Sequence, residues 1–117
     1  MPKEYFEKLS DHKSPPTYKF FDGEKWATSV SGKTIDVVSP IDDSIVGKIQ
    51  LVTFAEIDQA INRAHVAQKL WCTVPMIKRA QILHLAADWI REHEHYLTTS
   101  LIKEVGKTQA EAKDEIL

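Results

Sequence analysis

The spacing of apolar residues changes at Thr53, and this change divides the chain into two kinds of structure. Before it, short apolar and β-branched runs alternate with turn dipeptides such as Asp22-Gly23 and Ser31-Gly32. After it, apolar residues recur about every 3.6 positions, which is the period of an α-helix. The sequence therefore predicts an α+β chain, in which a small antiparallel β-hairpin and meander precede three to four α-helices.

The first half of the chain predicts short antiparallel strands. Asp22-Gly23 is a strong hairpin signal between the apolar residues 18–21 and residues 24–27. Two further runs rich in β-branched residues, 34–38 and 44–52, flank a turn near Pro40. Residues 1–17 lack a steady period, and we interpret them as an adaptable arm with one short helix, which precedes a structured region over residues 18–117.

The second half predicts helices with clear start and stop signals. Thr53 and Glu56 have the spacing of a capping box, in which hydroxyl and carboxylate bond to each other's backbone N–H. Pro75 suits the first turn of a second helix, and Gly106 suits a helix end. The first helix carries an apolar stripe, which we expect to be core: Ile57, Ala60, Ile61, Ala64, Ala67 and Trp71. The stripe of the second is wide enough to pack on two sides: Ala80, Ile82, Leu83, Ala86, Ala87, Trp89 and Ile90.

A last helix is predicted to begin at Thr108, which again has a glutamate three residues later. Its apolar residues have little sequence left to pack against: Ala110, Ala112, Ile116 and Leu117. We therefore expect the chain to be a piece of a longer protein.

Composition excludes several classes of function. The chain has 117 residues, is 43% hydrophobic and carries a formal net charge of -2, without the cluster of Lys and Arg that nucleic-acid binding requires. Its apolar runs are too short to cross a bilayer, so we expect neither a membrane nor a nucleic acid as partner. One cysteine, Cys72, forms no internal disulfide and fits a cytoplasmic protein.

Residues with reactive or metal-binding side chains do not form a motif. The only nearby residues in the sequence that could activate the thiol of Cys72 are Lys69, Lys78 and Arg79, and we expect a semi-buried structural thiol at a helix corner. His84 and His95 would share a helix face but lie roughly 16 Å apart, whereas His93 and His95 would point about 200° apart. We interpret a row of polar residues there as a solvated face: His84, Asp88, Glu92 and His95.

Gly106-Lys107-Thr108 resembles the end of a phosphate-binding loop, but Leu101 occupies the position of the required upstream glycine. A helix end followed by a helix start explains these residues better. No G-x-G-x-x-G sequence occurs in the chain. We therefore assign no catalytic, cofactor-binding or metal-binding residue to this chain.

The order of these segments resembles the amino-terminal part of the aldehyde dehydrogenase superfamily. The resemblance extends from Tyr18 to Leu117 and rests on several blocks: residues 21–26 (FDGEKW), 38–40 (VSP), 45–49 (IVGKI), 57–61 (IDQAI), 67–71 (AQKLW) and 79–83 (RAQIL). Residues 67–71, 78–84 and 100–107 look closest to the NADP-dependent, non-phosphorylating glyceraldehyde-3-phosphate dehydrogenases.

This resemblance implies a scaffold that covers the coenzyme-binding domain of a full-length enzyme. Such an enzyme would oxidise an aldehyde, here glyceraldehyde 3-phosphate to 3-phosphoglycerate, through a cysteine thiohemiacetal, with NADP or NAD as hydride acceptor. The family's catalytic cysteine, glutamate and cofactor loop have no counterpart here, so this chain alone should be inactive and bind no cofactor. Its partners would be the remainder of the dehydrogenase and, in a homo-oligomer, further copies.

Two other functions stay open at this point. The chain could be an independent interaction module whose helical face docks a partner without catalysis. It could also be a small enzyme that uses Cys72 or the histidines, although no motif supports this.

Overall fold

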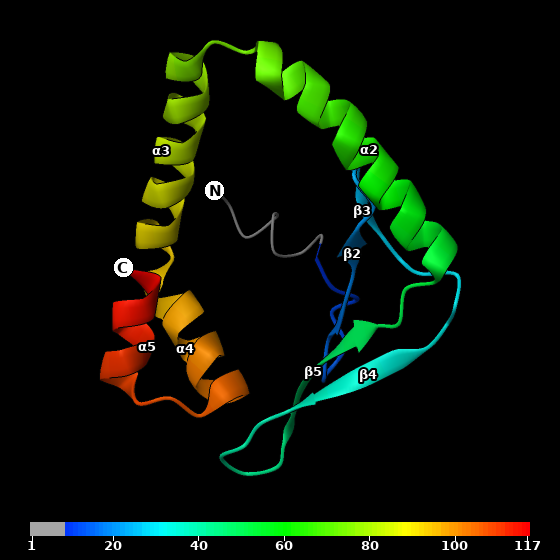
Figure 1. Cartoon of the computed structure of the whole chain (residues 1–117). Helices are drawn as coiled ribbons and strands as arrows, with labels where there is room; N and C mark the ends of the chain where they lie inside the picture. Colours follow the sequence, from blue (N-terminus) through cyan, green and yellow to red (C-terminus); the bar gives the residue numbers. More distant parts are fainter. Residues whose placement is uncertain (1–8) are drawn as a thin grey trace. The chain divides into compact units, whose positions relative to one another are not determined.

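The computed structural model describes residues 9–117, in which strands precede helices as predicted (Figure 1). The strands are β1 (Thr17–Tyr18), β2 (Phe20–Phe21), β3 (Trp26–Ala27), β4 (Thr34–Val38) and β5 (Ile45–Gln50). The helices are α2 (Phe54–Thr73), α3 (Met76–Glu92), α4 (Glu94–Val105) and α5 (Gln109–Ile116). The α+β prediction is confirmed. Of the arm predicted at residues 1–17, residues 1–8 lie outside the described part, and no helix is described over residues 9–17, where β1 begins at Thr17.

These elements belong to two compact units. The first unit includes the described residues up to Val37 and Gly47–Thr73. It therefore contains β1, β2, β3 and α2, most of β4 and the second part of β5. The second unit contains Val38–Val46 and Val74–Leu117, and therefore α3, α4 and α5.

The predicted hairpin forms between β2 and β3. The two strands pair antiparallel, with Phe21 opposite Trp26, and the rings of these two residues meet edge to face with centroids 5.4 Å apart. The Asp22 carboxylate accepts the backbone N–H groups of Glu24 and Lys25, each at 2.8 Å, and so holds the turn. The hairpin predicted at Asp22-Gly23 is confirmed.

The three-stranded sheet has the order β1-β5-β4, and β1 pairs parallel with β5. The prediction that all strands are antiparallel is wrong for this pair. A parallel pair needs a crossover connection, and the chain reaches β5 only after β2, β3 and β4, so no local turn signals the pairing. Gly47 of β5 permits it, because a Cβ there would lie 2.8 Å from Cε2 of Tyr18.

The first helix begins and ends where the sequence predicts. The Thr53 N–H donates to Oε2 of Glu56 at 2.9 Å, and the Glu56 N–H donates to Oγ1 of Thr53 at 3.3 Å, which completes the predicted capping box. α2 ends at Thr73, and Pro75 stands at the N-cap of α3.

The sequence signals a helix start at Pro75 and a helix end at Gly106, and the structure has a further break at His93, which separates α3 from α4. Nδ1 of His93 lies 2.8 Å from the carbonyl oxygen of Trp89, and the two rings stack with centroids 4.2 Å apart. The imidazole thus bonds to a carbonyl in the last turn of α3 and ends that helix, a role that apolar periodicity does not signal.

The helices α4 and α5 form an antiparallel pair in the second unit (Figure 1). Gly106 ends α4 with a φ of 74°, and its N–H donates to the carbonyl of Ile102 at 2.8 Å. Thr108 and Glu111 complete the second predicted capping box at the start of α5. Lys113 of α5 pairs with Glu94 of α4 at 3.0 Å, and Ala112 of α5 is fully buried.

The apolar stripes of α2 and α3 are not buried, which corrects the expectation of a core on these helices. Neither helix contains a buried residue, and Ile61 and Leu83 are 60% and 66% exposed. Within residues 9–117, Ala112 is the only buried hydrophobic residue. A stripe shows which side of a helix can be buried, but burial also requires a second surface, and the described residues do not supply one.

Candidate functional site

Among the described residues of the first unit, several hydrogen bonds converge at the start of α2. Oε2 of Glu56 accepts from Oγ of Ser29 at 2.8 Å and from the N–H and Oγ1 of Thr53 at 2.9 and 2.8 Å. Oε1 accepts the N–H of Val30 at 2.9 Å. We call this group of Ser29, Val30, Thr53 and Glu56 the Glu56 clasp. It ties the segment after β3 to the first turn of α2.

These hydrogen bonds set the charge of Glu56. The backbone N–H groups of Thr53 and Val30, followed by the two hydroxyls, lower the pKa of Glu56 to about 2. The carboxylate is therefore ionised at neutral pH and already accepts four hydrogen bonds. The sequence predicted the Thr53 half of the clasp from its spacing, but Ser29 and Val30 lie too far away in the chain for any spacing rule to connect them.

A second contact fixes the hairpin turn to α2. Nη1 of Arg63 lies 2.9 Å from Oδ2 of Asp22 and donates to its carbonyl oxygen at 3.0 Å. Gly23 has a φ of +93°, and a Cβ at this position would lie 2.8 Å from Cβ of Arg63. The hairpin and the helix are thus in close contact, and only glycine fits at this position of the turn.

Two recesses accompany these features, one in each unit. The first has a volume of about 310 Å³, and its lining comprises Phe20, Asp22, Ala27, Val30, Thr53, Ala55, Glu56 and Gln59. The second has a volume of about 390 Å³, and its lining comprises Ser39, Ile41, Asp42, Ser44, Ile45, Val46 and Lys103. Neither lining contains a thiol or an imidazole.

The pKa values of the carboxylates in these recesses are lowered by the groups that bond to them. Backbone N–H groups lower the pKa of Asp22, and the hydroxyl and N–H of Ser44 lower that of Asp42. A general base works best when its pKa is near the working pH, and these groups lie well below it. The carboxylates therefore hold loops and helix starts in place.

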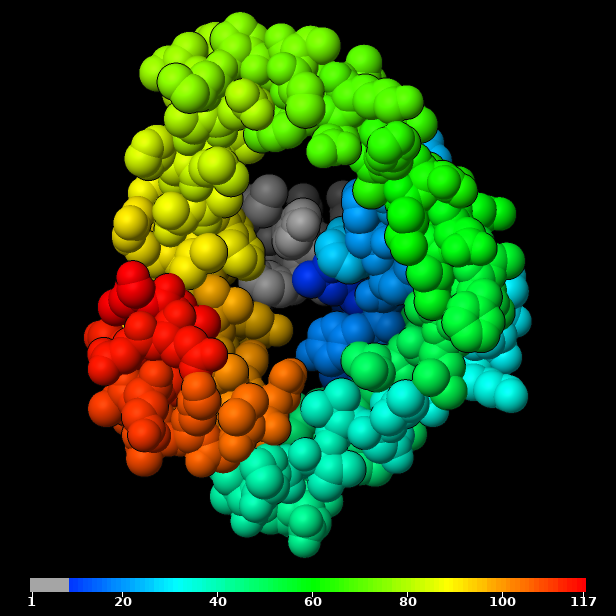
Figure 2. Space-filling model, viewed as in Figure 1, coloured from blue at the N-terminus to red at the C-terminus, as the bar shows by residue number. Residues whose placement is uncertain are grey.

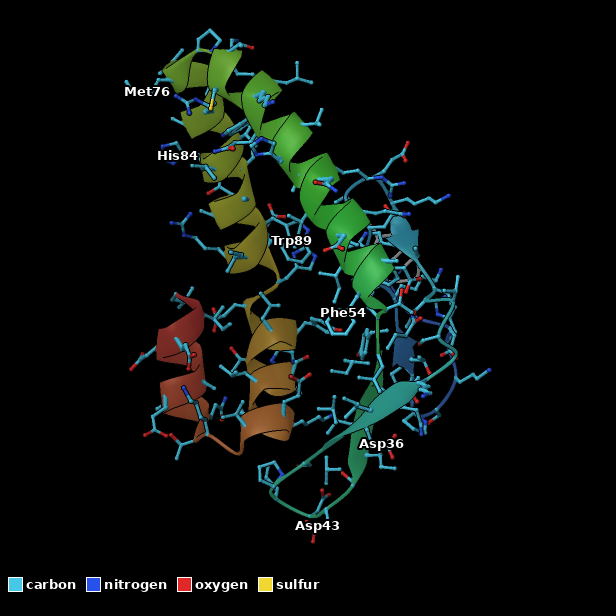
Figure 3. All side chains as sticks on the ribbon, turned by 45° about the vertical axis from the view of Figure 1, so that its right-hand side comes forward. Asp36, Asp43, Phe54, Met76, His84 and Trp89 are labelled. Carbon is cyan, nitrogen blue, oxygen red and sulfur yellow. The ribbon has the colours of Figure 1, made fainter. Side chains whose placement is uncertain are left out.

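The other candidate residues are also separate from one another. Cys72 is exposed, which corrects the expectation of a semi-buried thiol, because the end of α2 is uncovered in its unit. His84 lies on α3 (Figure 3) and His95 on α4, and no group of metal-binding side chains occurs among the described residues. The predicted polar row, His84, Asp88, Glu92 and His95, is exposed as expected. No helix in the described region is long and apolar enough to cross a membrane.

The described part of the chain is thus a clasped hairpin followed by helices with exposed apolar stripes. The aldehyde dehydrogenase family model matches residues 26–117, and the chain belongs to this family. The sequence-based assignment to the amino-terminal part of an aldehyde dehydrogenase is confirmed.

Known relatives match most of this chain but a small part of their own length. The NADP-dependent glyceraldehyde-3-phosphate dehydrogenase of Triticum aestivum is 36% identical over 100 residues, which are 86% of this chain and 20% of that protein. The vanillin dehydrogenase of Corynebacterium glutamicum is 32% identical over 98 residues, which are 84% of this chain and 20% of that protein. The chain thus spans about a fifth of the length of these relatives.

Solved structures of aldehyde dehydrogenases match the chain as well. A 3,6-anhydro-L-galactose dehydrogenase matches with a TM-score of 0.81 and 33% identity, over 86% of this chain and 21% of that one. The NADP-dependent glyceraldehyde-3-phosphate dehydrogenase of Bacillus halodurans, complexed with NADP, matches with a TM-score of 0.79 and 28% identity. This match covers 84% of this chain and 20% of that one. The fold described above is therefore found within much longer aldehyde dehydrogenase chains.

Proposed function

We propose that this chain is the amino-terminal scaffold of an NAD(P)-dependent aldehyde dehydrogenase that oxidises glyceraldehyde 3-phosphate to 3-phosphoglycerate, with NADP as hydride acceptor. The observation that carries the proposal is the match of 86% of the chain to a fifth of the Triticum aestivum enzyme. The similar NADP complex of the Bacillus halodurans enzyme supports the same cofactor class.

The scaffold role follows from what the described side chains already do. Aldehyde oxidation through a thioester needs an activated thiol, an oxyanion donor and a general base close together. Glu56 and Asp22 are engaged in holding the hairpin on α2, and Cys72 lies exposed at the other end of that helix. We therefore propose that the chain contributes no catalytic group and is inactive alone, with the remainder of the dehydrogenase as its partner.

A chimera tests this proposal. The chain replaces the matching fifth of the Bacillus halodurans enzyme, and NADPH production is measured with glyceraldehyde 3-phosphate, unphosphorylated glyceraldehyde and vanillin. We expect activity from the chimera with glyceraldehyde 3-phosphate and none from the free chain. A folded chimera without dehydrogenase activity would contradict the proposal.

An interaction module without catalysis is the second candidate, and the open apolar stripes of α2 and α3 favour it. This function predicts that the free chain is a stable, folded monomer that recruits a partner through one helical face. A chain that folds fully only in the chimera would argue against it. Size-exclusion chromatography with circular dichroism of the free chain separates the two proposals.

A further inference from the structure

In the first unit, residues 34–37 of β4 form an edge of the three-stranded sheet, and no other described strand pairs with their outer side. On the inner side, the N–H of Leu51 donates to the carbonyl of Lys33 at 2.9 Å. Backbone groups of a strand point alternately to its two sides, so those of Thr34 and Asp36 point away from β5. The segment that contains β4, coloured cyan, lies at the surface in the space-filling view (Figure 2). The outer side of β4 can therefore accept another strand.

This edge lacks the usual features that prevent pairing with another chain. Natural edge strands are commonly protected by a proline or by an unpaired charge. Residues 34–38 contain no proline, and three of the five are β-branched apolar residues. Their one charged residue, Asp36, is paired with Lys48 of β5 at 2.7 Å. The charge that would repel a neighbouring strand is thus largely neutralised within the sheet.

The two faces of the sheet carry different rows of side chains at this edge. The bond that joins β4 to β5 sets Ile35 opposite Ile49, and these residues are 46% and 47% exposed. On the other face, Asp36 lies opposite Lys48, as their ion pair confirms. An apolar row and a polar row therefore both end at the outer side of β4.

The strand β4 of a second copy continues both rows. Two copies related by a two-fold axis make the same contacts in both directions, and their edge strands then pair antiparallel. When the pair is centred on Ile35, the two Ile35 side chains meet, and Thr34 of each copy lies opposite Asp36 of the other. The Thr34 hydroxyl then faces a carboxylate to which it can donate.

Other registers of the same two strands are less favourable. A pair centred on Asp36 would set the two carboxylates directly opposite each other, and like charges in this position are destabilising. A pair centred on Thr34 would set Ile35 opposite Lys33 and interrupt the apolar row. The side chains of β4 therefore select one register.

We propose that the outer edge of β4 is a self-association surface, through which two copies of this chain join their sheets in the register centred on Ile35. A stable interface buries at least about 1,000 Å², and one short strand from each copy offers less than this. The dimer is therefore reversible and depends on the protein concentration. The inference concerns the free chain and does not depend on the proposed function.

Two substitutions at one edge position test the register. Thr34→Asp sets a carboxylate opposite Asp36 of the second copy, twice in each dimer, and should raise the dissociation constant roughly 10-fold. Thr34→Lys sets an ammonium group opposite the same carboxylates and should lower the dissociation constant. Sedimentation equilibrium of the free chain and of both variants measures these constants, and circular dichroism checks that the three proteins have equal helix content.

Cysteine cross-linking tests the contact at the two-fold axis. Ile35→Cys and Ile49→Cys are each made together with Cys72→Ser, so that each variant has one thiol of similar exposure, on β4 or on β5. The two copies of residue 35 would be a non-hydrogen-bonded pair with Cα atoms about 4.5 Å apart, a separation that a disulfide can span. Under mild oxidation, Ile35→Cys should form a disulfide-linked dimer much faster than Ile49→Cys.

Several outcomes would overturn the self-association surface. One is a free chain that stays monomeric at every concentration. Another is a dimer that Thr34→Asp and Thr34→Lys affect equally, or one that both cysteine variants cross-link at the same rate. If the free chain is monomeric and the thiol introduced by Ile35→Cys reacts with a maleimide in the free chain but not in the chimera, the edge is covered by the remainder of a dehydrogenase instead. An inactive chimera contradicts the proposed function alone, because the dimer is measured on the free chain.

Discussion

At the scale of single residues, Glu56 shows how one side chain serves a local and a distant role. Its spacing from Thr53 is visible in the sequence and predicts the capping box that the structure contains. Its bonds to Ser29 and Val30 depend on how the hairpin folds against α2, and no local pattern encodes them. The local half of the site was therefore predictable and the tertiary half was not.

The lowered pKa of Glu56 predicts a specific pH dependence. Folding lowers this pKa from 4.5 to about 2, so the stabilising contribution is complete above about pH 4.5 and is lost as the pH falls toward 2. Glu56→Gln should lower the urea midpoint at neutral pH, and its difference from the natural chain should shrink across this interval. Urea unfolding at a series of pH values measures this, with Glu92→Gln on α3 as the control. If the difference in urea midpoint between Glu56→Gln and the natural chain does not vary with pH, the lowered pKa of Glu56 does not contribute to stability as described.

Gly23 and Gly32 allow backbone strain and side-chain crowding to be separated. Both have positive φ, of +93° and +64°, but a Cβ at Gly23 would lie 2.8 Å from Cβ of Arg63, whereas nothing lies within 4 Å at Gly32. In the chimera, where we expect a sharper transition, Gly32→Ala should destabilise the protein by about 1 kcal/mol and Gly23→Ala by roughly 2 to 3 kcal/mol. Urea unfolding of both variants checks which one loses more stability. Equal losses of stability would show that the contact of a Cβ at Gly23 with Arg63 is unimportant.

At the scale of elements, local signals predicted most of the structure. Asp22-Gly23 predicts the hairpin, and the two capping boxes predict the starts of α2 and α5, because each depends on residues a few positions apart. The parallel pairing of β1 with β5 and the break at His93 were not predicted. The first joins segments separated by three strands, and the second depends on a ring that bonds to the carbonyl of Trp89.

The capping box of α5 predicts that its threonine matters more than a threonine inside a helix. Thr108 accepts the N–H of Glu111 and begins a helix of eight residues, whereas Thr99 only donates to the carbonyl of His95 within α4. Thr108→Ala should cost about 1 kcal/mol. Thr99→Ala should change the free energy of unfolding by less than about 0.5 kcal/mol. Hydrogen exchange of the α5 amides should accelerate in the first variant, and equal rates in both would contradict the role of the cap.

At the scale of the whole molecule, the apolar pattern was read correctly as amphipathic but wrongly as buried. The stripes of α2 and α3 have helical spacing, yet neither helix contains a buried residue. Whether a stripe is buried depends on another surface, and the sequence of the helix contains no information about that surface. The chain matches about a fifth of longer dehydrogenases. Under the proposed function, the stripes are exposed because the surface that would cover them belongs to the remaining part of such an enzyme.

The small core predicts how the free chain behaves in solution. Cooperative unfolding requires a large apolar area buried together, and Ala112 is the only buried hydrophobic residue among residues 9–117. We expect the free chain to keep a helical circular dichroism signal, to bind the dye ANS and to unfold over a broad urea range. In the chimera, ANS binding should fall and the transition should sharpen, because the stripes of α2 and α3 are then covered. A free chain that unfolds in a sharp transition and binds no ANS would show that these stripes need no partner, and would favour the independent interaction module over the scaffold.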